Sequence, residues 1–139
     1  MKQKDKDLLL LDLCSRLPYE VKIQYEDNIF TIDYISAMYE EIKLNTPNKY
    51  TIDVLEVKPY LFPLSSMTEE QKEELKSLGW NFDNFEIHNV SECLGTYREY
   101  VAHSDCFALI DWLNKNHFDY RNLINKNLAI DCTNLEIYK

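Results

Sequence analysis

The apolar positions of residues 5–17 recur with the period of an α-helix. They place Leu10, Cys14 and Leu17 on one face. Pro18 follows and ends the segment, because the residue before a proline avoids the helical conformation. We therefore expect an N-terminal helix with Cys14 on its apolar face.

The next segment alternates between apolar and polar side chains with the period of a β-strand. This alternation covers residues 19–26 and residues 29–35. Asp27 and Asn28 lie between the two runs, and both residue types tolerate the left-handed conformations of a tight turn. The pattern predicts a β-hairpin.

Residues 37–44 allow two interpretations. Met38, Ile42 and Leu44 alternate as in a strand, but Tyr39 and Ile42 also fit a helical face with Ile35. We favour the strand, because the segments on both sides also alternate. With a further run over residues 50–54, the region 19–57 predicts a curled antiparallel meander of about four strands, with a small open barrel as the alternative.

Prolines and capping residues organise the middle of the chain. Residues 58–65 contain two prolines, which cannot donate ladder hydrogen bonds, so we expect an extended connector across the core and not a central strand. Ser66 and Thr68 each begin a capping-box pattern, and Gly79 fits the position just past a helix end. These signals predict a helix over residues 66–78.

The C-terminal half is expected to be mostly helical. A helix over 104–116 is capped by Ser104, and a shorter helix over 120–126 ends at Asn127, while short strands fit near 85–90, 128–130 and 135–138. The predicted fold class is α+β: an N-terminal helix, an antiparallel meander, and a mostly helical C-terminal half packed on it. Residues 1–139 are expected to form a single domain.

Composition and charge exclude several classes of protein. The chain has 139 residues with 15 basic and 24 acidic side chains, giving a net charge of −9, so direct binding to nucleic acid is not expected. Its 2 glycines argue against a glycine-rich phosphate loop, and we expect no cofactor. The apolar run near the N-terminus, Leu8 to Leu11, ends at Asp12. This run is too short for the apolar region of a secretory leader. We expect a cytoplasmic protein that does not enter a membrane.

Two long segments carry a resemblance. Lys58-Pro-Tyr-Leu-Phe-Pro-Leu-Ser-Ser-Met-Thr-Glu-Glu-Gln71 and Trp112-Leu-Asn-Lys-Asn-His-Phe-Asp-Tyr-Arg121 resemble a family of small hypothetical proteins of gut bacteria, their mobile elements and their phages. The similarity covers most of the chain. The family differs where this chain has Glu20 and Asn127, since its members often have glycine there. The resemblance implies a bacterial or phage cytoplasm and supplies no catalytic residues.

One group of side chains has the types needed to bind a metal. Glu99 and His103 are spaced i, i+4, and Cys106 follows three residues later. Zinc sites usually have a fourth ligand and closer pairs, so a structural Glu–His contact is favoured and we expect no metal. The cysteines Cys14, Cys93, Cys106 and Cys132 lack an identifiable base, and we expect reduced, partly buried thiols.

A second group has the types needed for acid–base catalysis. His117, Asp119 and Arg121 bring an imidazole, a carboxylate and a guanidinium within five positions. The favoured interpretation is structural: His117 ends one helix, Asp119 caps the next, and Arg121 pairs with a carboxylate.

Three hypotheses about function remain, and the first is favoured. The chain is a small non-enzymatic accessory or protein-interaction module with a protein partner. Alternatively, the acidic helix 66–78 mimics nucleic acid and blocks a nucleic-acid-binding protein. The third hypothesis is a small enzyme or ligand-binding protein, with a pocket at which either His117 and Asp119 or Glu99 and His103 converge.

Overall fold

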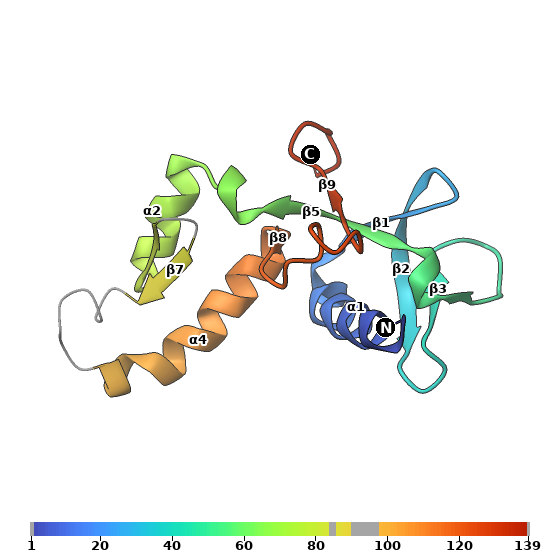
Figure 1. The fold of residues 1–139 in the computed structure, drawn as a ribbon, viewed down its shortest axis with the longest axis horizontal. Coiled ribbons are helices and arrows are strands. Elements are labelled where there is room, and N and C mark those ends of the chain that lie inside the picture. The colour runs from blue at the N-terminus through green and yellow to red at the C-terminus, as the bar shows by residue number, and fades with distance from the viewer. Residues whose placement is uncertain (1, 84–85, 90–97, 139) are drawn as a thin grey trace.

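The fold is α+β, with an N-terminal helix beside a mostly antiparallel sheet (Figure 1). The computed structural model describes residues 2–83, 86–89 and 98–138, and it describes the backbone alone at 83, 86, 88–89 and 98–106. Helix α1 spans Lys2–Arg16, close to the predicted range. It is followed by the hairpin of β1 (Lys22–Tyr25) and β2 (Asn28–Ser36), then β3 (Glu41–Leu44) and β4 (Ile52–Asp53).

The hairpin turn lies one residue earlier than predicted. Glu26 and Asp27 are its central residues, both with positive φ, and Tyr25 pairs with Asn28. Positive φ at both central residues defines the turn type whose twist matches antiparallel strands. Asn28 belongs to β2, and its side-chain amide donates to the carbonyl oxygen of Glu26 at 3.1 Å.

Strand β2 contains an irregularity that places the Tyr34 side chain on the exposed face of the strand and not on the core face. Its register with β3 shifts between Ile32 and Tyr34, so Ile35 packs against the core while Tyr34 is 49% exposed. The predicted strand over 37–44 forms only in its second half, as β3, and residues 37–40 are the turn before it. The sheet order runs from β4 to β8, so the described strands form an open sheet and not the alternative barrel.

The expected connector over 58–65 is wrong, because it contains strand β5 (Lys58–Pro63), which lies inside the sheet. β5 pairs antiparallel with β1 and parallel with both β8 (Phe118–Asp119) and β9 (Ile130–Asp131). Its prolines occupy the second and last positions. The residues between them keep their N–H groups, and that of Phe62 donates to the carbonyl oxygen of His117 at 2.8 Å.

Helix α2 (Glu69–Ser77) begins three residues after the predicted start, at the second of the two capping-box signals. The Thr68 side chain accepts from the Gln71 N–H, and the Gln71 side chain accepts from the Thr68 N–H. Gly79 follows the helix with φ of 95°, as expected for a glycine past a C-terminus. A separate hairpin follows, formed by β6 (Trp80–Asp83) and β7 (Glu86–Asn89).

The prediction of a mostly helical C-terminal half is wrong. It contains β6, β7, β8 and β9, and residues 123–127 form a turn where a helix was predicted. Helix α4 (Arg98–Lys115) starts well before Ser104, so that residue lies inside the helix and does not cap it. Residues 135–138 form no strand. Strands β8 and β9 give little local signal, because their pairing partner β5 lies about 55 and about 70 positions earlier in the chain.

Left-handed backbone occurs at Glu20 and Asn127, the two positions at which the resemblance leads us to expect glycine in similar proteins. Glu20 has φ of 54° and Asn127 has φ of 60°. Glycine reaches this region without the steric cost that a Cβ brings, so a glycine at either position would fit the backbone seen here.

The buried side chains form two clusters. The first lies between α1 and the sheet and includes Leu9, Leu13 and Ile23. The second joins α2, α4 and the β6–β7 hairpin, and it includes Leu75 and Phe118. Figure 1 shows α1 and the larger sheet on one side and α2 with β7 on the other, with β5 and α4 running between them.

Candidate functional site

The predicted corner at residues 117–121 joins α4 to strand β8. His117 follows α4 with φ of 61°, and the chain then enters β8. The His117 ring stacks on the Tyr138 ring, with centroids 3.6 Å apart and planes 11° from parallel. The Tyr138 hydroxyl in turn accepts from the Lys22 N–H at 2.9 Å and donates to the Tyr60 carbonyl oxygen at 2.8 Å. Tyr138 is therefore held by stacking on His117 and by hydrogen bonds to β1 and β5.

Burial makes His117 a weak base. Its pKa is lowered to about 4, first by removal from water and then by the nearby Arg16 and Lys22 charges. Its Nδ1 is buried without a hydrogen-bond partner among the described residues. The imidazole is therefore neutral near pH 7.

Asp119 is buried, and both of its carboxylate oxygens accept backbone N–H groups. Oδ1 accepts from Leu123 and Oδ2 from Ile124, each at 2.9 Å. The carboxylate thus caps the turn that follows β8. Asp119 therefore has the structural role that the capping interpretation expects. The segment that it stabilises is a turn and not the predicted helix.

Arg121 belongs to a buried ionic network that links three parts of the chain. Its Nη1 lies 2.9 Å from Asp12 Oδ1, while Arg16 Nε lies 2.7 Å from Asp12 Oδ2. Arg16 Nη2 also donates to the Phe118 carbonyl oxygen at 2.6 Å, and both guanidinium groups lie over the Tyr120 ring. Asp12 and Arg16 are fully buried, whereas the Arg121 side chain is 20% exposed, so one buried carboxylate pairs with a buried and a partly exposed arginine.

Asp12 and Arg16 were not predicted to be buried, although the sequence holds a signal for them. Leu9, Asp12, Leu13 and Arg16 are spaced i, i+3, i+4 and i+7, and these four residues form the buried face of α1. Cys14, expected on the apolar face, is exposed instead. The prediction counted apolar residues only, and an i, i+4 Asp–Arg pair can share a buried face because its charges compensate each other.

The His117 environment leads to a pH-dependence prediction. The folded pKa of about 4 lies below the ordinary histidine pKa of 6.5, so between these pH values the unfolded chain binds the proton more readily than the folded chain. Stability should therefore fall as the pH drops from 6.5 to 4. The difference corresponds to at most about 3 kcal/mol, and partial exposure reduces the expected loss to about 2 kcal/mol.

His117→Asn is the variant that tests this dependence, because asparagine tolerates the positive φ at this position. Urea unfolding at several pH values should show a shallower acid loss for the variant than for the wild type. Carboxylates contribute equally to both proteins, so identical slopes would contradict the assignment to His117.

The structure does not describe the side chains of the candidate metal ligands or of two of the cysteines. Glu99, His103 and Cys106 lie in α4 at positions whose side chains are not described, and Cys93 lies outside the described residues. Elsewhere, no group of three or more His, Cys, Asp or Glu side chains among the described residues could hold a metal ion. Cys132 is buried, which raises the pKa of its thiol to about 12 and disfavours a reactive thiolate.

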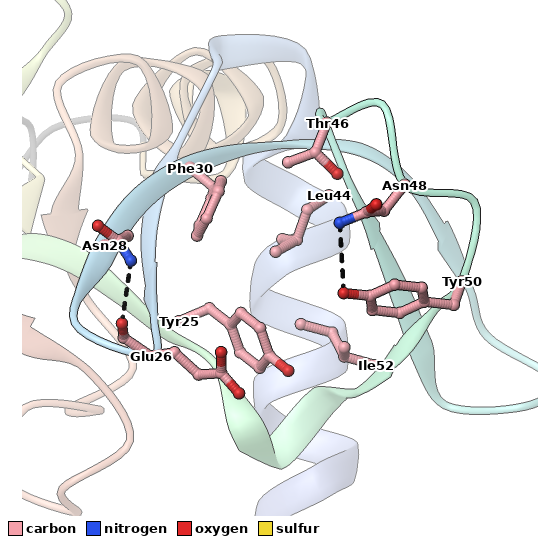
Figure 2. Close-up of a pocket in the computed structure, with 9 residues that line it drawn as sticks. All are labelled: Tyr25, Glu26, Asn28, Phe30, Leu44, Thr46, Asn48, Tyr50 and Ile52. Atoms are coloured by element: carbon pink, nitrogen blue, oxygen red, sulfur yellow. Dashed lines mark hydrogen bonds between the residues drawn. The ribbon is translucent and has the colours of Figure 1, made fainter.

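The sequence did not predict an aromatic pocket that lies among β1, β2, β3 and β4, whereas the corner lies beside β8 at the other end of the strand order. It has a volume of about 160 Å³, and Figure 2 shows its side chains arranged around a common space. Tyr25 and Phe30 come from the β1–β2 hairpin, and Tyr50 comes from the loop before β4. Leu44 and Ile52 form the apolar floor, and Glu26, Asn28, Thr46 and Asn48 complete the lining.

The loop that carries Tyr50 is fastened by a buried lysine. Lys43 Nζ donates to the carbonyl oxygens of Leu44 at 2.6 Å and Thr46 at 3.0 Å. Further along, the Asn48 amide donates to the Tyr50 hydroxyl at 3.3 Å (Figure 2). The loop that forms one wall of the pocket is therefore held in place by hydrogen bonds within the protein. The sequence showed these aromatic residues, but the curl of the sheet brings residues 25–30 against residues 44–52.

An exposed apolar pair lies at the turn between β2 and β3. Met38 is 82% exposed and Tyr39 is 71% exposed. The turn itself is anchored: the Tyr39 N–H donates to Ser36 Oγ at 3.3 Å, and the Gln3 amide of α1 donates to the Glu40 carboxylate at 3.2 Å. We call Met38 and Tyr39 the β2–β3 turn surface.

Among the described helices, none combines the length and apolar character needed to cross a membrane. Comparison with known proteins gives no further constraint on the site. No family model, curated protein or solved structure matches this chain.

Proposed function

We propose that this chain is a small non-enzymatic accessory protein that acts by binding another protein, in a bacterial or phage cytoplasm. The observation that carries the proposal is the β2–β3 turn surface, where Met38 and Tyr39 are 82% and 71% exposed. Methionine and tyrosine are enriched in protein–protein interfaces. Tyrosine buries a large area at low entropic cost, and methionine adapts its shape to irregular surfaces.

The anchoring of this turn supports the proposal. Gln3 of α1 contacts Glu40, and Ser36 fixes the Tyr39 backbone, so the two exposed side chains are presented from a held backbone. A surface that is already ordered loses less conformational entropy on binding, and more of its contact energy becomes affinity.

The polar groups at the corner favour a binding role over an enzymatic one. Asp119 caps a turn, Arg121 pairs with Asp12, and His117 stacks on Tyr138 with a lowered pKa. The Arg121 and His117 contacts join segments distant in sequence, and the Asp119 contacts shape a local turn. A general acid–base pair would instead require a titrating group facing a substrate.

The nucleic-acid mimic has weaker support. On α2, Glu69 pairs with Lys72 at 3.2 Å and Glu73 pairs with Lys76 at 3.5 Å. Alternating charges of this kind are typical of a solvated helix face, and they reduce the uniform negative potential that a mimic needs.

Capture of the partner by wild-type and variant proteins tests the proposal. A photo-crosslinking residue at position 38 should trap a protein from a bacterial lysate. The double variant Met38→Ser/Tyr39→Ser should weaken binding of that protein at least about tenfold, because both side chains lie at the contact.

Leu135→Ser is the matched control, since Leu135 is 46% exposed and lies near the C-terminus, away from this turn. It should retain the captured protein. The proposal is wrong if the double variant and the wild type capture the same proteins with equal affinity.

A further inference from the structure

The aromatic pocket has walls that meet at an angle. The Tyr25 and Phe30 ring centroids are 6.4 Å apart, and their planes are tilted by 56°, so the two rings form a corner and not a parallel stack. Tyr50 faces them from the other side of the space and is 64% exposed (Figure 2). Aromatic rings gathered around a small space are suited to hold an organic cation, because the face of each ring is electronegative.

A carboxylate adds negative charge at the same place. Glu26 lies beside the Tyr25 ring in Figure 2. Burial, and after it the Glu26 charge, raises the pKa of the Tyr25 hydroxyl, as expected where a second negative charge is disfavoured. The chain as a whole carries a net charge of −9, which increases the local concentration of cations.

We propose that this pocket binds the head group of an organic cation, either an alkylammonium or a guanidinium. Its volume of about 160 Å³ is close to that of an apolar cavity that admits a benzene ring, so the pocket has room for one head group. Leu44 and Ile52 contact the alkyl part of the cation, while the three rings and Glu26 contact its charge.

The first experiment separates charge from shape. The labelled full-length protein is titrated by NMR with choline chloride, with its uncharged carbon isostere, and with sodium chloride at equal ionic strength. Choline should cause saturable shifts at Tyr25, Phe30 and Tyr50, and the isostere should bind several-fold more weakly. Equal binding of choline and its isostere, or choline shifts that sodium chloride reproduces, would exclude a choline-type ligand. Either result would overturn the proposal if the peptide pair described below also shows no discrimination.

Variants of an exposed wall residue test the ring itself. Tyr50→Leu should weaken choline binding about two- to fivefold, and Tyr50→Trp should restore or increase it, because tryptophan is the best ring for cations. Glu26→Gln should weaken binding as well, mainly at low salt. Tyr34→Leu is the matched control, since Tyr34 is 49% exposed and does not line the pocket. The proposal also fails if Tyr50→Leu and Tyr34→Leu bind choline equally.

A pair of peptides identifies the source of the cation. An arginine-containing peptide is compared with the same peptide carrying citrulline, which keeps the shape and loses the charge. Binding of the arginine peptide alone supports a side chain on a partner protein, and binding of choline alone supports a small molecule. Loss of discrimination in both pairs overturns the proposal. Since the Met38→Ser/Tyr39→Ser variant keeps the pocket intact, failure here is distinct from failure of the proposed function.

Discussion

Replacing Asp12 by asparagine is expected to lower the free energy of unfolding by about 3–5 kcal/mol. The carboxylate is fully buried and pairs with Arg16 at 2.7 Å and Arg121 at 2.9 Å. Asparagine keeps the shape and removes the charge, which leaves two guanidinium groups without their counter-ion, one of them in the interior. Chemical denaturation with urea measures the change.

Asp7→Asn is the control for this substitution. Asp7 lies on the exposed side of the same helix, where it accepts from the Gln3 amide at 2.9 Å, and its loss should change stability by less than about 0.5 kcal/mol. Adding Arg16→Met to Asp12→Asn should recover part of the loss, because the buried cation is then absent as well. Equal stabilities of Asp12→Asn and Asp7→Asn would contradict the role given to the network.

Phe118→Ala is expected to cost about 3–5 kcal/mol, because it removes a fully buried ring. The ring stacks on Trp112 at 5.6 Å and lies 6.3 Å from Phe62, both in the second cluster. The Phe118 carbonyl oxygen accepts from Arg16 of α1, so this residue also joins the second cluster to the helix that covers the first. We propose on this basis that the two clusters unfold together, as one domain.

Fluorescence and circular dichroism test both parts of this prediction. Trp80 and Trp112 both pack in the second cluster and report its unfolding, while circular dichroism reports the helices. Coincident transitions are expected for the wild type and for Phe118→Ala, shifted to lower denaturant in the variant. The control Phe107→Ala, at a ring that is 76% exposed on α4, should stay within about 0.5 kcal/mol of wild type. An early tryptophan transition followed by a separate loss of helix would contradict cooperative unfolding.

Local signals were sufficient for the elements whose stabilising contacts lie close in sequence. The Thr68–Gln71 capping box and Gly79 frame α2 within one short segment. The hairpin of β1 and β2 was likewise predicted, apart from a one-residue displacement of its turn. In each case the partner of a backbone or side-chain group lies within a few residues, so the sequence pattern contains the interaction itself.

Strand β5 shows why the rest could not be predicted in this way. Its two prolines argued against a central strand, yet β1, β8 and β9 all pair with it. The partners lie up to about 70 residues away, and the two-residue strands β8 and β9 have no periodicity of their own. Their hydrogen bonds to β5 are long-range contacts that only the folded chain supplies.

The sequence by itself determined an α+β protein with an N-terminal helix, an antiparallel hairpin and a capped acidic helix, because these depend on short-range periodicity and capping. Tertiary structure alone decided that Asp12 and Arg16 are buried together, and that Tyr25, Phe30 and Tyr50 surround one pocket. A local ion pair can be buried only where the rest of the fold satisfies its remaining groups, as Arg121 and the Phe118 carbonyl oxygen do here. A pocket exists only where the curl of a sheet brings remote side chains together.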